Sequence, residues 1–371
     1  MVFMTDQMRN KLEEYKKNLA RLFAKSRLWS SDTDEEKKRI RSTMELPFES
    51  LSFYRYYKLD DKGCVLSDLR NARLTITSPK MFNDPYDSLL YVNKEWMLST
   101  LDRGSREKMC EIVKRVKAGE KIEKVAPDLT EINAAVCRRL TKLDSKRLET
   151  ILLDDNFAHN ALRGNMSVVD CLKQHNRIAC FSETDVSPLL WSHYADCGKG
   201  ICVEYDIPKV IAGSIFPDSF INFKERKIFV SFLPILYSDE RYDATHLVNE
   251  YNENLLIVGM GYQSDYAKLT SSHDLLDSEK TAVYKSKDWA YEREWRLIFY
   301  PFTMLDPDRI SVQSPTVKSV ILGNAMLDSQ IEQVMDALRT RKEKTGENIN
   351  LKRLVLDTDS RDFALTTIPF G

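Results

Sequence analysis

An arginine among aromatic residues is the first candidate for chemistry, in the segment Tyr54-Arg55-Tyr56-Tyr57. Side chains alternate along a strand, so Arg55 shares a face with Tyr57 and points away from its two immediate neighbours. A guanidinium that rises from a rigid strand can bind a phosphate through two parallel hydrogen bonds. The competing interpretation is an arginine whose aliphatic stem covers the edge of a sheet. Arg55 and Tyr57 are therefore candidate ligands for a phosphorylated molecule.

Two carboxylates, Glu292 and Glu294, stand directly before an apolar run at 295–300. On extended backbone, residues two apart project to the same face, so we expect the two carboxylates side by side. Paired carboxylates can stabilise a developing cation or hold a ribose hydroxyl group. The competing interpretation is the exposed start of a strand, with salt bridges to Arg293 and Arg296.

Residues 180–200 combine a serine at the end of a predicted strand with a histidine between aromatic residues. Ser182 offers a short hydrogen-bonding group at the floor of a cleft. His193 is a candidate acid or base because its unperturbed pKa of about 6.5 lies near neutrality. A lone histidine among aromatic side chains is also typical of a structural residue. Trp191 and Tyr194 are candidate stacking partners for a planar ligand.

A turn is predicted over residues 82–87, with the sequence F-N-D-P-Y-D. Asparagine and aspartate before a proline close turns through hydrogen bonds from their side chains to the backbone. Asn83 is a candidate for lining a pocket, and the alternative is a purely structural turn with Phe82 as its plug.

The composition limits the classes of protein. Of the 371 residues, 43% are hydrophobic, and 55 basic residues balance 56 acidic ones to a net charge of −1. This balance gives no support to a sequence-independent DNA binder. The apolar runs are far shorter than the roughly 20 residues of a membrane span, so we expect a cytoplasmic protein without membrane contact. The seven cysteines form no C-x-x-C pair, so we expect neither a disulfide framework nor a metal site.

The helices fall into two groups. Apolar spacing predicts a helix over 5–28, and a start signal follows at 31–34, so residues 1–46 are expected to form a helical appendage. That appendage is a candidate surface for a partner or an oligomer. Within the remaining domain, 47–371, the charged helical pattern of about 94–176 predicts an insertion or lid.

Strand-like patterns predict an α+β fold, with helices flanking a mixed, mostly antiparallel sheet. No dinucleotide or P-loop fingerprint is present. The strands are expected at 53–57, 73–77, 177–182, 200–205, 227–232, 235–237 and 295–300, and a final strand–helix–strand unit at 317–322, 328–340 and 351–356.

Several of these segments together resemble a bacterial family, domain of unknown function 2971 (DUF2971). The resemblance runs over about residues 53–357. It is carried by F-N-D-P-Y-D, by C-F-S-E, by L-W-S-H-Y-A-D-x-x-K-G-I-C-V-E, by W-x-Y-E-x-E-W-R and by V-I-L-G at Val320–Gly323. The family implies no particular reaction.

The order Arg55, Ser182 and Glu292-x-Glu294 is similar to that of toxin-class ADP-ribosyltransferases, which use NAD as a substrate. The resemblance implies that Arg55 grips the NAD pyrophosphate and that Ser182 orients the nicotinamide ribose or the glutamate. It also implies that Glu294 hydrogen-bonds the ribose 2′-hydroxyl while positive charge builds at C1′. Tyr57, Trp191 or Tyr194 would then stack on the nicotinamide.

The leading hypothesis is a cytoplasmic bacterial enzyme that transfers ADP-ribose or hydrolyses NAD, as toxins and anti-phage defence effectors do. Its expected ligand is a nucleotide-type small molecule, and the macromolecular acceptor is left open. Two alternatives stay open. One is a non-catalytic binding or regulatory module with an aromatic pocket of Trp191, Tyr194 and Trp295. The other is a metal-dependent nuclease or phosphoesterase whose oxygen ligands are Asp84, Asp87, Glu292 and Glu294.

Overall fold

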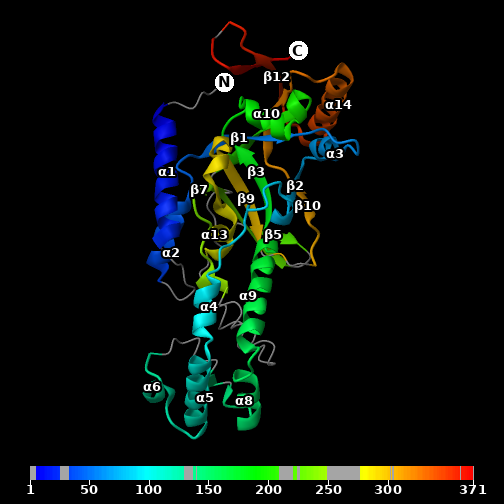
Figure 1. Ribbon diagram of the computed structural model, residues 1–371. Helices are drawn as coiled ribbons and strands as arrows, with labels where there is room; N and C mark the ends of the chain where they lie inside the picture. Colours follow the sequence, from blue (N-terminus) through cyan, green and yellow to red (C-terminus); the bar gives the residue numbers. More distant parts are fainter. Residues whose placement is uncertain are drawn as a thin grey trace.

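The computed structural model has the predicted α+β fold (Figure 1). It describes residues 6–25, 33–128, 137–138, 140–208, 220–223, 226–248, 276–300, 302, 305–359 and 361–370. The α-helices within these ranges are α1 (Asp6–Lys25), α2 (Asp34–Met44), α3 (Cys64–Arg70), α4 (Lys94–Thr100), α5 (Arg103–Lys117), α6 (Ile122–Val125), α8 (Ser145–Leu152), α9 (Phe157–Gln174), α10 (Pro188–Tyr194), α13 (Asp277–Val283) and α14 (Asp328–Thr345).

The strands agree with the predicted ones and add four short ones. They are β1 (Ser50–Tyr57), β2 (Arg73–Thr77), β3 (Arg177–Ser182), β4 (Ile201–Pro208), β5 (Phe220–Phe223), β6 (Arg226–Pro234), β7 (Leu236–Ser238), β8 (Tyr284–Ser286), β9 (Glu294–Tyr300), β10 (Arg309–Gln313), β11 (Thr316–Leu322), β12 (Asn350–Leu356) and β13 (Leu365–Pro369). The additions β5, β8, β10 and β13 are three to five residues long.

One large sheet organises the described part of the chain. Its strands run in the order β13-β12-β11-β4-β1-β3-β9-β6-β5, and β2 joins β3 to β10. The pairs are antiparallel except for β11 with β12, the two strands that α14 connects. The predicted strand–helix–strand unit at the C-terminus is therefore confirmed. A parallel pair needs such a crossover helix.

The sheet separates between β1 and β3. These two strands share a single register pair, Tyr54 with Ser182, whereas β1 pairs with β4 along its whole length. At its opposite end β3 pairs with β2, through Ile178 and Thr77. Between these two points, β3 has β9 on one side and an opening on the other.

The N-terminal helices pack against this sheet. Helix α1 buries Leu12, Tyr15, Leu19 and Phe23 at helical spacing, in the same hydrophobic cluster as the central strands. The Tyr15 ring stacks on that of Trp295 with 6.0 Å between centroids, and its hydroxyl donates to the Met44 carbonyl at 2.9 Å. The two predicted helices are confirmed over the described residues, and α1 and α2 share the core of the sheet. The domain boundary at residue 46 stays a prediction.

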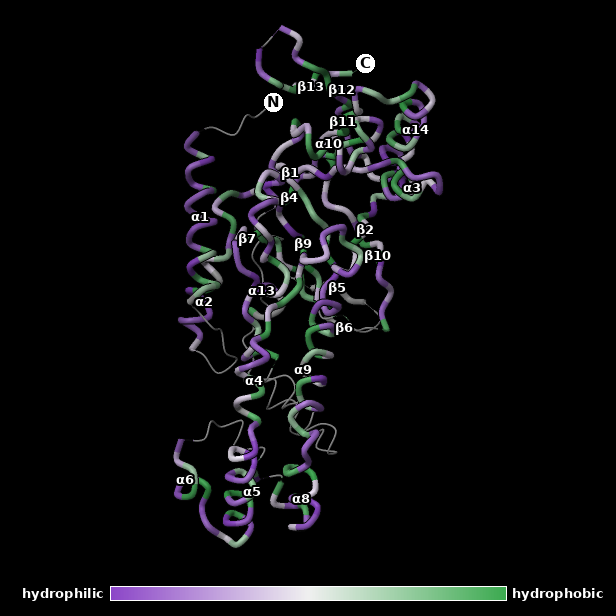
Figure 2. The backbone as a smooth tube through the Cα atoms, viewed as in Figure 1, coloured by the Kyte–Doolittle hydropathy of each residue, from purple (hydrophilic) through white to green (hydrophobic). Residues whose placement is uncertain are grey.

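The helices α4, α5, α6, α8 and α9 form an arm that extends away from the sheet (Figure 1). Hydrophilic and hydrophobic residues alternate along it (Figure 2), and two small clusters, around Met97 and around Val113, form its interior. The helical prediction for 94–176 is confirmed over the described residues. Among all residues that the structure describes, no helix combines the length and the apolar character of a membrane span.

We predict that Leu19→Ala lowers the free energy of unfolding by about 2–5 kcal/mol, because Leu19 is fully buried between α1 and the sheet. Denaturant unfolding followed by tryptophan fluorescence measures the change. Lys17→Ala, an exposed position on the same helix, is the control and should cost less than about 0.5 kcal/mol. A Leu19 variant as stable as this control would show that α1 does not belong to the core.

Candidate active site

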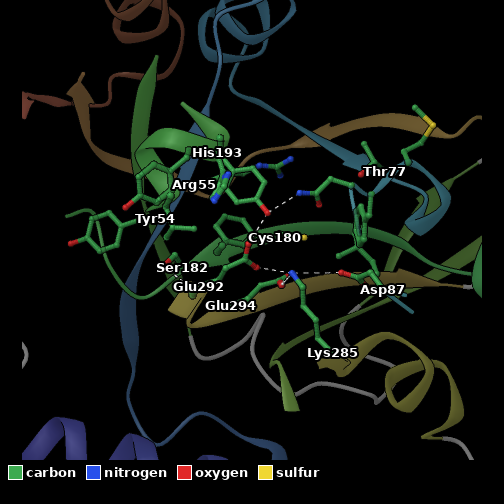
Figure 3. A pocket seen from close by; sticks show the side chains of 18 residues that line it. Tyr54, Arg55, Thr77, Asp87, Cys180, Ser182, His193, Lys285, Glu292 and Glu294 are labelled. Atoms are coloured by element: carbon green, nitrogen blue, oxygen red, sulfur yellow. Dashed lines mark hydrogen bonds and ion pairs between the residues drawn. The ribbon is translucent and has the colours of Figure 1, made fainter. Parts of the chain in front are cut away.

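A cavity of about 410 Å³ lies at the opening between β1 and β3. It brings together residues that are far apart in the sequence (Figure 3). Predicted site residues that line it are Arg55, Asn83, Ser182, His193, Tyr194, Glu292 and Glu294. The strands β1, β3 and β9 are neighbours in the sheet, which is why Arg55, Ser182 and Glu294 meet. Two predicted stacking residues, Tyr57 and Trp191, are not among the lining residues.

Tyr57 and Trp191 take part in packing beside the cavity. The Tyr57 hydroxyl shares a 2.8 Å hydrogen bond with that of Tyr205, and its ring lies 5.2 Å from the Arg55 guanidinium carbon. Trp191 is 3% exposed, and its indole nitrogen donates to the Asp185 carbonyl at 2.7 Å. Tyr57 therefore packs against the guanidinium of Arg55, and Trp191 packs edge to face against the ring of Tyr56.

A buried network of charged side chains lies across the cavity from Arg55 (Figure 3). Lys285 Nζ lies 2.6 Å from Glu292 Oε2, 2.7 Å from Glu294 Oε2 and 3.7 Å from Asp87 Oδ2. Arg296 donates to Glu294 Oε1 at 2.7 Å through Nε, and to Asp87 Oδ2 at 2.6 Å through Nη2. All five residues are buried, so each carboxylate needs a cation in contact to remain ionised.

The backbone around the two glutamates differs from the prediction. Residues Lys287–Glu292 form a 3₁₀ helix, and Arg293 has a left-handed φ of 46° before β9 begins at Glu294. The expectation of two carboxylates on one extended strand is therefore wrong. They converge because Lys285 attracts both. Ser88, next to Asp87, also has a left-handed φ, of 53°. Strain at non-glycine residues is maintained only where surrounding contacts enforce it.

The two glutamates have opposite pKa shifts. Burial alone would raise the pKa of Glu294, but the charges of Arg296 and Lys285 lower it to about 2. For Glu292, burial is the largest effect and raises the pKa above its usual value, although Lys285 opposes the shift. Glu294 is therefore a permanent negative charge, and Glu292 is the more basic carboxylate.

Glu292 is connected to the cavity through Tyr194. The Tyr194 hydroxyl donates to Glu292 Oε1 at 2.6 Å and accepts a hydrogen bond from Asn83 Nδ2 at 3.3 Å. Ser182 acts on the backbone instead, because its hydroxyl donates to the Glu292 carbonyl at 2.7 Å. Asn83, Ser182 and Tyr194 thus position Glu292. The exposed His193 lines the same cavity, and its acid–base role stays a prediction.

Arg55 presents a hydrogen-bonding group that nothing in the described protein satisfies. Its Nη1 is buried and has no partner, while the guanidinium carbon lies 5.2 Å and 6.0 Å from the centroids of the Tyr57 and Phe181 rings. Figure 3 shows Arg55 across the cavity from Lys285 and Asp87. A buried donor without a partner costs free energy, so this position favours an anionic ligand.

Sequence reasoning missed Lys285. It named Arg296 as a salt-bridge partner of the glutamates at an exposed position, whereas Arg296 and both glutamates are buried. Lys285 belongs to the three-residue strand β8, outside the recognised motifs, and only its closeness to Glu292 in the sequence pointed to it. Cys180 also lines the cavity, but burial and the charge of Glu294 raise its pKa well above the usual value. A thiol of this kind is a poor nucleophile.

The structure places the residues that were named for the two alternative functions, and both functions stay predictions. Trp295 and Trp191 are buried in the core, so only Tyr194 of the predicted aromatic recognition pocket faces the cavity. Over the described ranges, no three His, Cys, Asp or Glu side chains are arranged to hold a metal ion. The carboxylates of Asp87, Glu292 and Glu294 instead converge on the ammonium group of Lys285.

The fold and the site together define the class of this protein, which is an α+β domain with a polar cavity in its sheet. Residues 190–297 match the family model described as a protein of unknown function (DUF2971). The predicted resemblance to that family is thereby confirmed over this segment, which holds His193, Tyr194, Lys285 and both glutamates. No curated protein and no solved structure matches the chain. The resemblance to ADP-ribosyltransferases stays a prediction.

We predict that in Glu294→Gln the free energy of unfolding falls less steeply than in the wild-type protein as the pH is lowered. The native pKa of Glu294, about 2, lies below its ordinary 4.5, so the unfolded chain binds the proton more tightly. Ionised Glu294 therefore contributes about 3 kcal/mol to the free energy of unfolding at a pH above its unfolded pKa. This contribution is lost as the pH falls toward 2. Urea unfolding between pH 7 and pH 3 measures the slope.

The exposed control Glu332→Gln should retain the wild-type slope. An unchanged slope in Glu294→Gln would mean that Glu294 is not held ionised by Lys285 and Arg296.

Proposed function

We propose that the cavity between β1 and β3 binds NAD and that the protein breaks the bond between nicotinamide and ribose. The observation that carries the proposal is the convergence of Arg55, Ser182, Glu292 and Glu294 on one cavity from neighbouring strands. Its volume of about 410 Å³ falls within the range of small-molecule sites. Exposed Met81 and His193 are among its lining residues, so part of a dinucleotide can extend into solvent.

Arg55 would bind the pyrophosphate. Its buried Nη1 has no partner within the described protein, and a phosphate oxygen would supply one. The aromatic rings of Tyr57 and Phe181 lie near the guanidinium and limit its orientations. A planar, pre-oriented donor loses little entropy when it binds, which favours two-point recognition of a phosphate.

The carboxylates would act at the ribose. As the C1′–N bond breaks, its electron pair goes to the nicotinamide nitrogen, and the ribose takes up the positive charge. The permanent charge of Glu294 stabilises that cation. Water then attacks C1′, and Glu292, whose pKa is raised, accepts the proton. The products are nicotinamide, ADP-ribose and a proton. An acceptor other than water would give transfer of ADP-ribose by the same steps.

An enzyme of this kind consumes a metabolite found in every cytoplasm. That consumption is compatible with a bacterial toxin or anti-phage defence effector, and this biological role is part of the proposal.

We expect the purified protein to release nicotinamide from NAD, and Glu292→Gln to lower kcat by about 10²–10⁴-fold, the usual contribution of a general base. Chromatography of the products distinguishes hydrolysis from transfer. Glu332→Gln on the surface of α14 is the matched control and should retain full turnover. No NAD consumption by the wild-type protein, together with no thermal shift on adding NAD, would refute the proposed function.

Arg55→Gln tests the phosphate contact separately. We expect it to lower kcat/KM for NAD by about 10–100-fold, from the loss of a charge-assisted hydrogen bond of about 1.5–3 kcal/mol. Hydrolysis of nicotinamide riboside, which has no phosphate, should change by less than about twofold. Arg339→Gln, an exposed arginine, is the control for the charge removed. Equal losses for both substrates would show that Arg55 does not contact phosphate.

A further inference from the structure

A second cavity, of about 810 Å³, lies on the other side of Lys285. Its walls come from residues within 84–91, 238–243 and 281–289. The turn after η1 (Pro79–Met81) divides the two cavities, because Asn83 and Asp87 line the first whereas Asp84 and Ser88 line the second. Lys285 lines both. The second cavity is therefore a separate space that shares a wall with the candidate active site.

The aromatic rings of this cavity already attract cations. The guanidinium carbon of Arg241 lies 5.9 Å from the ring centroid of Tyr86 and 5.6 Å from that of Tyr91. Lys285 Nζ lies 4.9 Å from the ring centroid of Trp289. The negative face of an aromatic ring attracts organic cations in this way, most strongly for tryptophan.

The charges of the lining also favour a cation. Five carboxylates line the cavity, from Asp84, Asp239, Glu240, Asp243 and Asp288, and the cations among the lining residues are Arg241 and Lys285. Lys287 forms an ion pair with Asp239. The cavity therefore carries an excess of negative charge.

Of these carboxylates, Asp84 gives the strongest indication that the cavity binds a cation. It is 7% exposed, and its Oδ1 accepts a 2.8 Å hydrogen bond from the Tyr86 backbone nitrogen. Within the described ranges no lysine, arginine or histidine forms an ion pair with it, unlike the buried carboxylates Asp87, Glu292 and Glu294. A buried carboxylate without a counter-ion is costly, and a bound cation would remove that cost.

We infer that this second cavity binds an organic cation, a protonated amine or a guanidinium group, between Asp84 and the ring of Trp289. The aromatic wall favours an organic cation over a metal ion, which would require several oxygen ligands in contact. The inference stands on the second cavity alone and does not depend on cleavage of NAD.

Calorimetric titration of the full chain tests it without any variant. The probes are spermidine, N-acetyl-arginine amide and N-acetyl-citrulline amide, the last a neutral molecule of nearly the same shape as the arginine probe. We expect saturable binding of at least one cation and at least 10-fold weaker binding of the citrulline probe. Tighter binding of spermidine would identify a free polyamine as the ligand, and tighter binding of the arginine probe a peptide side chain.

Two variants locate the binding. Asp84→Asn keeps the oxygen that caps the turn but removes the charge, and Trp289→Leu removes the ring. Each should weaken cation binding at least fivefold, while Asp61→Asn, at an exposed turn, should not. Thermal unfolding confirms that each variant is folded. The inference is overturned if no cation binds below about 10 mM, if citrulline binds equally well, or if neither variant alters binding.

Discussion

The attraction between two buried cations and three buried carboxylates is the interaction on which the site depends. Lys285 and Arg296 together contact Asp87, Glu292 and Glu294, which come from a turn, a 3₁₀ helix and the first residue of β9. Removal of one member of such a network leaves a charge without compensation in a medium of low polarity, which typically costs about 3–5 kcal/mol. The network therefore holds three backbone segments together at the wall of the cavity.

The separation of β1 from β3 provides the space that this network borders. A continuous sheet would close the position with backbone hydrogen bonds and side-chain packing. Here the strands meet only at Tyr54 and Ser182, and the buried donor of Arg55 faces the gap. On the far side of Lys285, Asp84, which forms no ion pair with a described residue, lines a second cavity with an aromatic wall. The same turn and the same lysine thus support two spaces with different electrostatic character.

Two close approaches of the backbone pack the turn between α10 and β4 against β1 and against the residue that follows β11. A side chain on Gly200 would lie 2.1 Å from the Tyr57 carbonyl oxygen, and one on Gly323 would lie 2.0 Å from that of Gly198. Gly323 also donates to the Gly200 carbonyl at 3.0 Å. The K-G and V-I-L-G motifs therefore serve packing, and their proximity could not be deduced from either segment alone.

The sequence by itself determined the elements with strong local patterns. Alternation located β2 at its observed bounds, and helical spacing located α1, because these signals depend only on which side of an element is buried. Residue type also identified Arg55, Ser182, Tyr194 and the two glutamates as candidates for one site. Only the tertiary structure decided that Lys285 joins the carboxylates and that Trp191 packs away from the cavity. Coulombic and packing partners distant in the chain leave no local periodicity, so they emerge only once the sheet has formed.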